Sequence, residues 1–248
     1  MMNLQIFFSA HPSVALAFSG GVDSSYLLYA GLRYGAAVKA YYVKSAFQPE
    51  FELEDARRLA LELNADMTVL REDVLAAAEV AANPADRCYY CKKVIFERIQ
   101  KQAAADGFSV LIDGTNASDD YGDRPGMKAL AEMSVRSPLR ECGITKDEIR
   151  KLSKEAGLFT WNKPAYACLA TRIPTGRAIT NELLHKVEAA ESILFSMGFS
   201  DFRVRVLNDA ARIQIASEQM YMVLGYKERI IQALKPYFSA VLLDLVNR

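Results

Sequence analysis

The stretch VALAFSGGVDSS, residues 14–25, decides the fold of the chain. It begins with an apolar run, 14–18, that has the length of a buried parallel strand. Two glycines and Asp23 follow, and then an apolar helical stretch, 25–34. Glycines let backbone N–H groups approach an anion closely, and a helix N-terminus adds donors and a positive dipole end. The stretch therefore predicts a strand, a phosphate-binding loop and a helix.

The loop differs from a Walker loop, because no Gly-Lys-Ser/Thr follows it. Ser19, Ser24 and Ser25 add hydroxyl donors around the turn. The carboxylate of Asp23 would repel phosphate unless it holds Mg²⁺ or caps the helix. A plain strand-to-helix turn capped by Asp or Ser is the structural alternative, and the complete SGGVDS pattern in this position favours the phosphate loop.

The first two thirds of the chain alternate strands and helices. Besides the elements of the opening stretch, strands are expected at 38–43, 67–70 and 110–114 and helices at 51–63 and 91–105. A capping box, Thr145 to Glu148, predicts one further helix that Gly157 ends. The alternation predicts an α/β fold, a parallel sheet with helices on both faces whose ligand binds at the carboxyl ends of the strands.

A segment without periodicity, 161–176, marks the expected junction between a first domain, 1–165, and a smaller α/β domain, 166–248. The second domain is predicted to order its elements as helix, strand, strand, helix and strand, at 181–197, 202–207, 211–216, 218–234 and 240–245. In the first of these strands, Arg203 and Arg205 alternate with valines. Both arginines therefore belong to one polar face of the strand.

The composition bounds the class of protein. The 248 residues carry 30 Lys and Arg against 30 Asp and Glu, a net charge of zero that argues against a surface built to coat nucleic acid or acidic membrane. No apolar stretch approaches the ~20 residues of a membrane span, and no signal peptide is recognised at the start. We therefore expect a cytoplasmic protein with no membrane or nucleic-acid partner.

Cysteine usage points to a chemical role. In a reducing compartment, Cys88 and Cys91 at Cys-x-x-Cys spacing indicate a metal or redox site rather than a structural disulfide. The pair alone fits a redox couple or half of a zinc site as well as an iron–sulfur site. Cys168 lies in the segment PAYACLATR, and Cys142 is interpreted as a packing thiol.

These segments resemble a known family. SGGVDS is similar to the pyrophosphate loop of the PP-loop ATP pyrophosphatase superfamily, with its adenine nucleotide alpha hydrolase-like fold. Five further segments carry a narrower match, RCYYCKK at 87–93, DGTN at 113–116, DRPG at 123–126, RSPL at 136–139 and WNKPAYACLATRIP at 161–174. Together they resemble the LarE family of ATP-dependent sulfur transferases, which acts in nickel-pincer cofactor biosynthesis for lactate racemase.

The resemblance implies a reaction and its site residues. ATP with Mg²⁺ would adenylate a carboxylate of a pyridinium mononucleotide and release pyrophosphate, and sulfur would then convert the acyl-adenylate to a thiocarboxylate. Asp23 and Cys168 are the expected catalytic residues. The expected nucleotide-binding residues are Ser19, Gly20, Gly21, Asp23, Ser24, Ser25, Thr115, Asn116, Arg124 and Arg136. Arg172, Arg203 and Arg205 are expected to bind the anionic substrate, although the two strand arginines also fit a solvated face.

The resemblance leaves two sources of sulfur open. In one branch of the family a single cysteine, here Cys168, gives up its own sulfur and becomes dehydroalanine. In the other, three cysteines hold a [4Fe–4S] cluster that carries the transferred sulfide, and Cys88, Cys91 and Cys168 would be its ligands. We favour the cluster because a sacrificial cysteine needs no further thiols. The family also implies a sulfide or other sulfur donor and a homo-oligomer, possibly a hexamer.

Three rival functions remain at this point. A PP-loop tRNA thiolase also uses three cysteines, but it needs a basic RNA-binding surface, against which the net charge of zero counts. A synthetase or ammonia ligase of the same superfamily would not need the cysteines. A regulator that binds ATP without turnover would release no pyrophosphate.

Overall fold

The computed structural model describes residues 3–119 and 125–246. The chain divides into two compact units, and the first comprises 1–80 and 86–165. The second comprises 166–248 together with the short segment 81–85. Asn83 fixes that segment to its unit, because its side-chain amide donates to the carbonyl oxygens of Pro174 (2.8 Å) and Arg177 (3.1 Å). No helix in the described ranges is long and apolar enough to span a membrane.

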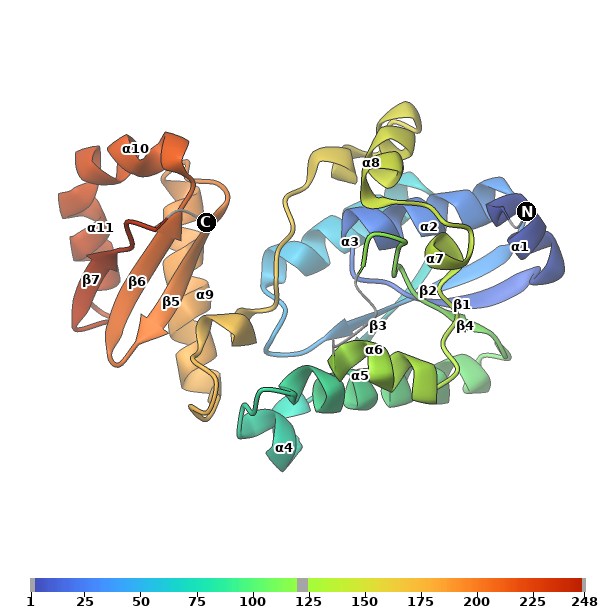
Figure 1. The fold of residues 1–248 in the computed structure, drawn as a ribbon, viewed down its shortest axis with the longest axis horizontal. Helices are drawn as coiled ribbons and strands as arrows, with labels where there is room; N and C mark the ends of the chain where they lie inside the picture. Colours follow the sequence, from blue (N-terminus) through green and yellow to red (C-terminus); the bar gives the residue numbers. More distant parts are fainter. Residues whose placement is uncertain (1–2, 120–124, 247–248) are drawn as a thin grey trace. The chain divides into compact units, whose positions relative to one another are not determined.

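The first unit is built on a parallel sheet in the order β3-β2-β1-β4 (Figure 1). Its strands are β1 (Ser13–Ala17), β2 (Ala37–Lys44), β3 (Asp66–Arg71) and β4 (Leu111–Ile112). Side chains of β1 alternate between two buried clusters, since Val14 and Leu16 pack with one and Ala15 with the other. Both faces of the sheet are therefore buried, and the predicted α/β fold is confirmed.

Helices cover each face of this sheet (Figure 1). One buried cluster includes side chains of α1 (Leu4–Ala10), α2 (Val22–Arg33), α3 (Glu50–Glu62) and α8 (Lys146–Glu155). The other includes side chains of α5 (Arg87–Ala105) and α6 (Pro125–Glu132). Two short helices complete the unit, α4 (Ala78–Ala81), which extends into the second unit, and α7 (Pro138–Glu141). The predicted capping box of α8 is present in both directions between Thr145 and Glu148.

The second unit has a three-stranded sheet in the order β5-β6-β7. β5 (Phe202–Leu207) pairs antiparallel with β6 (Ala210–Ile215), which pairs parallel with β7 (Ala240–Leu243). Its helices are α9 (Asn181–Ser196), α10 (Met220–Gly225) and α11 (Lys227–Leu234). The single helix expected at 218–234 is thus two helices, divided at Tyr226 directly after Gly225, whose lack of a side chain lowers helix propensity.

Candidate active site

The loop between β1 and α2 has the geometry of an open anion site. Gly20 has a φ of +71°, and a Cβ on it would lie 3.1 Å from the Cβ of Ala56 in α3. Glycine is thus required by the backbone conformation and favoured by the close approach of α3. Gly21 is the N-cap of α2 and provides no side-chain cap. Because no side chain caps this N-terminus, its positive dipole end can receive phosphate oxygens.

The segment after β4 approaches the start of α2 closely. A Cβ on Gly114 would lie 2.9 Å from the backbone nitrogen of Ser24, so only glycine fits there. The buried carboxylate of Asp113 accepts a hydrogen bond from Ser137 Oγ (2.7 Å) and others from the backbone and side chain of Thr115. Asn116 Nδ2 lies 3.4 Å from Asp23 Oδ1. The predicted residues Thr115 and Asn116 therefore lie beside the loop.

Asp23 has a second partner that the sequence did not indicate. Lys146 Nζ donates to Asp23 Oδ2 at 2.6 Å, and the lysine is the first residue of α8. Its backbone nitrogen also donates to Ser118 Oγ at 3.0 Å, which holds the start of α8 against the segment after β4. The carboxylate is thus paired with a cation in the structure. The capping box marked this helix start but not the role of its lysine.

Two arginines, Arg124 and Arg136, are predicted to bind ATP. Arg124 lies outside the described residues. Arg136 Nε donates to Glu141 Oε1 at 2.8 Å, its Nη1 lies 3.2 Å from His11 Nε2, and its guanidinium lies over the ring of Phe7. This pairing lowers the pKa of Glu141 and raises that of Arg136. Contacts of both arginines with ATP stay predictions.

In the second unit Arg172 is almost fully buried and holds the segment that carries Cys168. Its Nε and Nη2 fork onto the buried carboxylate of Glu191 in α9 (2.9 and 3.1 Å). Its Nη1 donates to the carbonyl oxygens of Ala167 (2.6 Å) and Cys168 (3.2 Å). Most of its donors are therefore used inside the protein. Its contact with substrate stays a prediction.

Arg203 and Arg205 lie on one face of β5, as their alternation predicted. Arg203 is buried with its guanidinium over the ring of Tyr166, and burial, then the nearby charge of Arg172, lowers its pKa to about 10. Arg205 Nη1 donates to the carbonyl oxygen of Thr171 at 2.6 Å. Its pKa is lowered by burial and then by Arg172 and Arg212. Crowded arginines of this kind favour a bound anion.

The three cysteines predicted as metal ligands come from both units. Cys88 and Cys91 lie one turn apart on α5, which starts four residues earlier than expected, at Arg87. Cys168 directly precedes the 3-10 helix η3 (Leu169–Arg172) of the second unit. Within the described ranges, no three His, Cys, Asp or Glu side chains are already grouped as a metal site. Cys142 packs against the core of the first unit, as expected, and burial raises its pKa.

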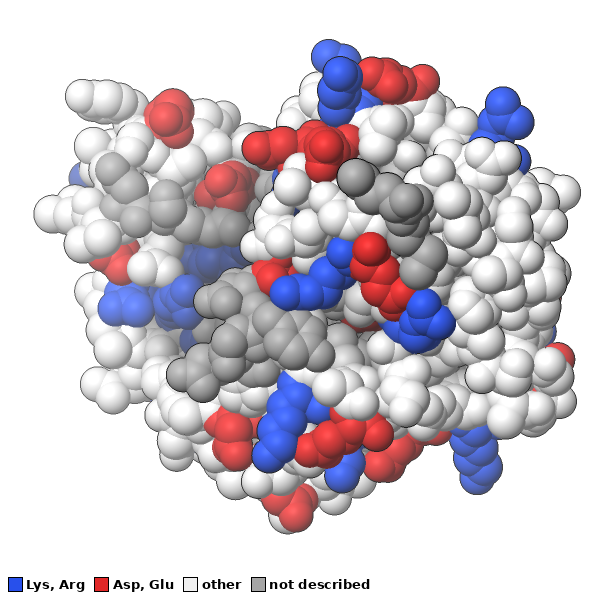
Figure 2. All heavy atoms as spheres, turned by 45° about the vertical axis from the view of Figure 1, so that its right-hand side comes forward, with Lys and Arg blue, Asp and Glu red and all other residues white. Residues whose placement is uncertain are grey.

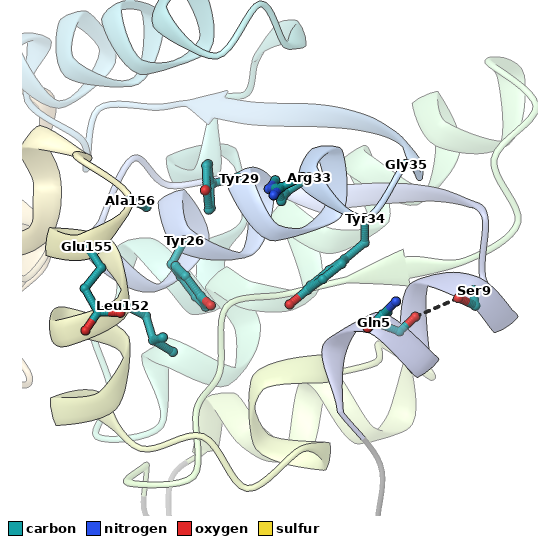
Figure 3. A pocket seen from close by; sticks show the side chains of 10 residues that line it. All are labelled: Gln5, Ser9, Tyr26, Tyr29, Arg33, Tyr34, Gly35, Leu152, Glu155 and Ala156. Carbon is teal, nitrogen blue, oxygen red and sulfur yellow. Dashed lines mark hydrogen bonds between the residues drawn. The ribbon is translucent and has the colours of Figure 1, made fainter.

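A cavity of about 770 Å³ lies elsewhere in the first unit, between α1, the part of α2 from Tyr26 onward and the end of α8 (Figure 3). The hydroxyl ends of Tyr26 and Tyr34 lie in it, and Glu155 borders it (Figure 3). Burial, and then the neighbouring Tyr34, Tyr29 and Glu155, raise the pKa of Tyr26 to about 12. The lining residues that the structure describes include none of those predicted for ATP, substrate or metal, so this cavity is separate from the candidate active site.

Comparison with known proteins identifies close relatives over nearly the whole chain. The chain is 39% identical over 222 residues to the uncharacterized protein slr1717 of Synechocystis, covering 88% of this chain and 82% of that protein. It is 35% identical over 235 residues to the pyridinium-3,5-bisthiocarboxylic acid mononucleotide synthase of Lactiplantibacillus plantarum, covering 94% of this chain and 85% of the synthase. No family model matches the chain.

Weaker similarity extends to other PP-loop enzymes. The GMP synthase of Aeropyrum pernix is 28% identical over 72% of this chain and 38% of its own length. The tRNA-specific 2-thiouridylase MnmA of Thermotoga neapolitana is 26% identical over 60% of this chain and 54% of its own length. These matches support the PP-loop fold, whereas the coverage and identity of the synthase decide the narrower relationship. The chain belongs to the LarE family, the family of the pyridinium-3,5-bisthiocarboxylic acid mononucleotide synthase.

Proposed function

We propose that the chain is an ATP-dependent sulfur transferase that converts a carboxylate of a pyridinium mononucleotide to a thiocarboxylate, with AMP and pyrophosphate as products. The single observation that carries this proposal is the open N-terminus of α2, with Asp23 beside it, in a chain that is 35% identical to the synthase over 94% of its length. Nickel-pincer cofactor biosynthesis is the corresponding pathway.

The first unit supplies the adenylation chemistry. The backbone of the loop and the start of α2 bind the phosphates that leave as pyrophosphate. Asp23 is the residue that would hold Mg²⁺, which on binding neutralises charge on the phosphates. With Asp23 engaged in this way, the ammonium of Lys146, which pairs with Asp23 in the structure, would be available to the same phosphates. A substrate carboxylate oxygen attacks the α-phosphorus, and the P–O bond to pyrophosphate breaks.

The second unit supplies anion recognition. Arg203 and Arg205 bind the phosphate or carboxylates of the mononucleotide, because a bound anion offsets the burial, and after it the repulsion from Arg172, that lower their pKa values. Arg172 braces the backbone of Cys168 through the contacts to Ala167 and Cys168. The arginines thus divide into two that bind substrate and one that also orders the sulfur-transfer segment.

Sulfur delivery rests on the cysteines. The donor set fits an iron–sulfur cluster, because Cys88 and Cys91 lie a helical turn apart on α5 and Cys168 adds a third thiol. A cluster held by these three residues would supply the sulfide. Alternatively, Cys168 itself gives up its sulfur. In either case sulfur attacks the carbonyl carbon of the acyl-adenylate and the bond to AMP breaks. Sulfide gives the thiocarboxylate directly. The Cys168 thiolate gives a thioester, from which loss of the Cα proton and cleavage of the Cβ–Sγ bond release the thiocarboxylate and leave dehydroalanine.

A pyrophosphate-release assay with the mononucleotide substrate tests the proposal. Release that depends on ATP and on the mononucleotide, together with formation of thiocarboxylate, is the expected result. Release driven by tRNA would favour the thiolase instead, which the interspersed acidic and basic side chains on the face shown in Figure 2 do not support. ATP binding without any release would favour the regulator.

The source of sulfur needs a separate experiment. Anaerobic purification followed by an iron and sulfide count is expected to give about four of each per chain. Intact-mass spectrometry after turnover is expected to find the chain unchanged and able to act again with inorganic sulfide. Loss of the mass of H₂S from Cys168, with no more than one product per chain, would establish the sacrificial mechanism. We further propose that the protein is cytoplasmic, which cell fractionation tests, and homo-oligomeric, which sizing of the purified protein tests.

A further inference from the structure

A second lysine lies beside the phosphate loop, and the function proposed above does not use it. Lys163 Nζ lies 2.7 Å from Asp55 Oδ2 and 3.5 Å from the carbonyl oxygen of Gly20. Its side chain is only 14% exposed, and the ammonium also lies over the ring of Phe51. A largely buried ammonium needs an opposite charge or hydrogen-bond acceptors, and here Asp55 supplies the charge and the carbonyl oxygen of Gly20 an acceptor.

The backbone around Lys163 is fixed, so its side chain is delivered to this position by the fold. Arg150 of α8 donates from Nη1 to the carbonyl oxygen of Trp161 (2.8 Å) and from Nη2 to that of Lys163 (3.1 Å). Lys163 N donates to the carbonyl oxygen of Thr160 at 3.0 Å. The backbone of Lys163 is therefore held in place. Its ammonium, at the end of a flexible four-carbon chain, remains able to change partners.

Asp55 is held next to the loop just as firmly. It lies in α3 immediately before Ala56, whose backbone nitrogen and Cα would lie 3.3–3.4 Å from a Cβ on Gly20. The aspartate, the lysine and the glycine that turns the phosphate loop are thus neighbours within the first unit. An anion cradled by this loop would be close to the Lys163 ammonium and would repel the Asp55 carboxylate.

We propose that Lys163 is a further phosphate-binding residue, whose ammonium leaves Asp55 and pairs with the terminal phosphates of ATP and then with the released pyrophosphate. The loop itself carries no lysine, in contrast to a Walker loop. The side-chain cations that pair with the phosphates must therefore come from elsewhere in the fold. Lys163 supplies one from the segment after α8. The inference rests on the proposed binding of ATP at the loop.

The pair makes opposite demands on its two members. Removing Lys163 removes an attraction for phosphate, whereas removing Asp55 removes both a repulsion and a competitor for the ammonium. Lys163→Met should therefore weaken binding and Asp55→Asn should strengthen it. In the double variant the benefit of Asp55→Asn should shrink to the relief of the repulsion, because the ammonium for which Asp55 competes is missing.

Isothermal titration of the full chain with Mg-ATP, and separately with inorganic pyrophosphate, measures these effects. We expect Lys163→Met to raise Kd about tenfold or more, as for loss of a charge-assisted hydrogen bond. Lys163→Arg should stay within about threefold of wild type because it keeps the charge. Lys151→Met, which changes an exposed lysine on the preceding helix α8, is the control and should leave Kd unchanged.

Two results would overturn the inference. If Lys163→Met and Asp55→Asn both lower the melting temperature but leave both Kd values unchanged, the pair is a structural salt bridge only. If Asp55→Asn weakens binding as much as Lys163→Met does, the aspartate is not a competitor. A wild-type protein that binds neither probe would remove the proposed function as well, so that failure is distinguishable from the first two. If Lys163→Met does not fold, the direction in which Asp55→Asn changes the two Kd values still tests the inference.

Discussion

The phosphate loop of the first unit and the arginine face of the second manage charge in opposite ways. At the loop each cation has its own anion, Lys146 with Asp23 and Lys163 with Asp55. On β5, two arginines crowd beside Arg172, and their pKa values are lowered. Paired charges suit a ligand that arrives with its own metal and exchanges partners. Crowded, buried cations suit a ligand that arrives as an anion.

The largest expected effect comes from breaking a pair at the loop. Asp23→Ala removes the carboxylate that would hold Mg²⁺ and leaves Lys146 without its partner. We expect ATP-dependent pyrophosphate release to fall by about 1,000-fold or more, as when a charge-stabilising group is removed from an active site. The thermal unfolding midpoint should remain close to that of the wild type, because the residue is partly exposed. Release at the wild-type rate would contradict the role assigned to Asp23.

The second-largest expected effect is on the stability of the second unit, at the buried Arg172 beside the arginine face of β5. Glu191→Gln leaves the guanidinium of Arg172 buried without its carboxylate, and Arg203 lies close by. We expect the free energy of unfolding to fall by about 3 kcal/mol or more, the cost of breaking a buried ion pair. Glu182→Gln, on an exposed part of the same helix α9, should cost less than about 1 kcal/mol. Equal losses in a denaturant titration would refute this assignment.

How far the sequence predicts these features depends on distance along the chain. The strand 202–207, the capping box of α8 and the glycine turn at the loop are local patterns, and the structure has all three. The helix α1 was missed, although Asn3 caps it through Ile6 N. The pairs Lys146–Asp23 and Lys163–Asp55 join segments more than a hundred residues apart. Residue type and local spacing do not predict such long-range contacts, so they are found only in the folded structure.

The site residues divide along the same line. Sequence reasoning placed Thr115 and Asn116 at the nucleotide site because they follow the expected strand 110–114 and ligands bind at the carboxyl ends of parallel strands. It grouped Arg172 with the strand arginines as a substrate ligand. The buried fork from Arg172 to Glu191 gives that arginine a structural task as well. Burial and partner choice depend on α9 packing against β5 and η3, which no local motif contains.

The third effect tests whether crowding marks a binding site. Arg205→Met removes one cation of the β5 face, and we expect KM for the mononucleotide to rise about 10- to 100-fold, as for loss of a hydrogen bond to a charged group. The rate at saturating substrate should change less. Arg229→Met on α11, an exposed arginine outside the cluster, is the control. An unchanged KM would mean that the crowded face binds something other than the substrate.

The smallest expected effect tests whether an ion pair away from the phosphate loop influences nucleotide binding. On β2, the Lys39 ammonium lies 3.0 Å from Asp106, which also accepts from the Tyr41 hydroxyl at 2.7 Å. The hydroxyl and then the ammonium lower the pKa of Asp106 to about 2. Because this folded-state pKa is depressed, the stabilisation is fully present above the ordinary value of 3.8 and is lost as pH falls through about 2. Asp106→Asn should therefore flatten the acid dependence of the melting temperature between about pH 4 and pH 2, and at pH 7 it should leave the Kd of Mg-ATP unchanged. A higher Kd would show that an ion pair remote from the loop also affects nucleotide binding. Pairing of charges would then not distinguish the phosphate loop from the rest of the first unit.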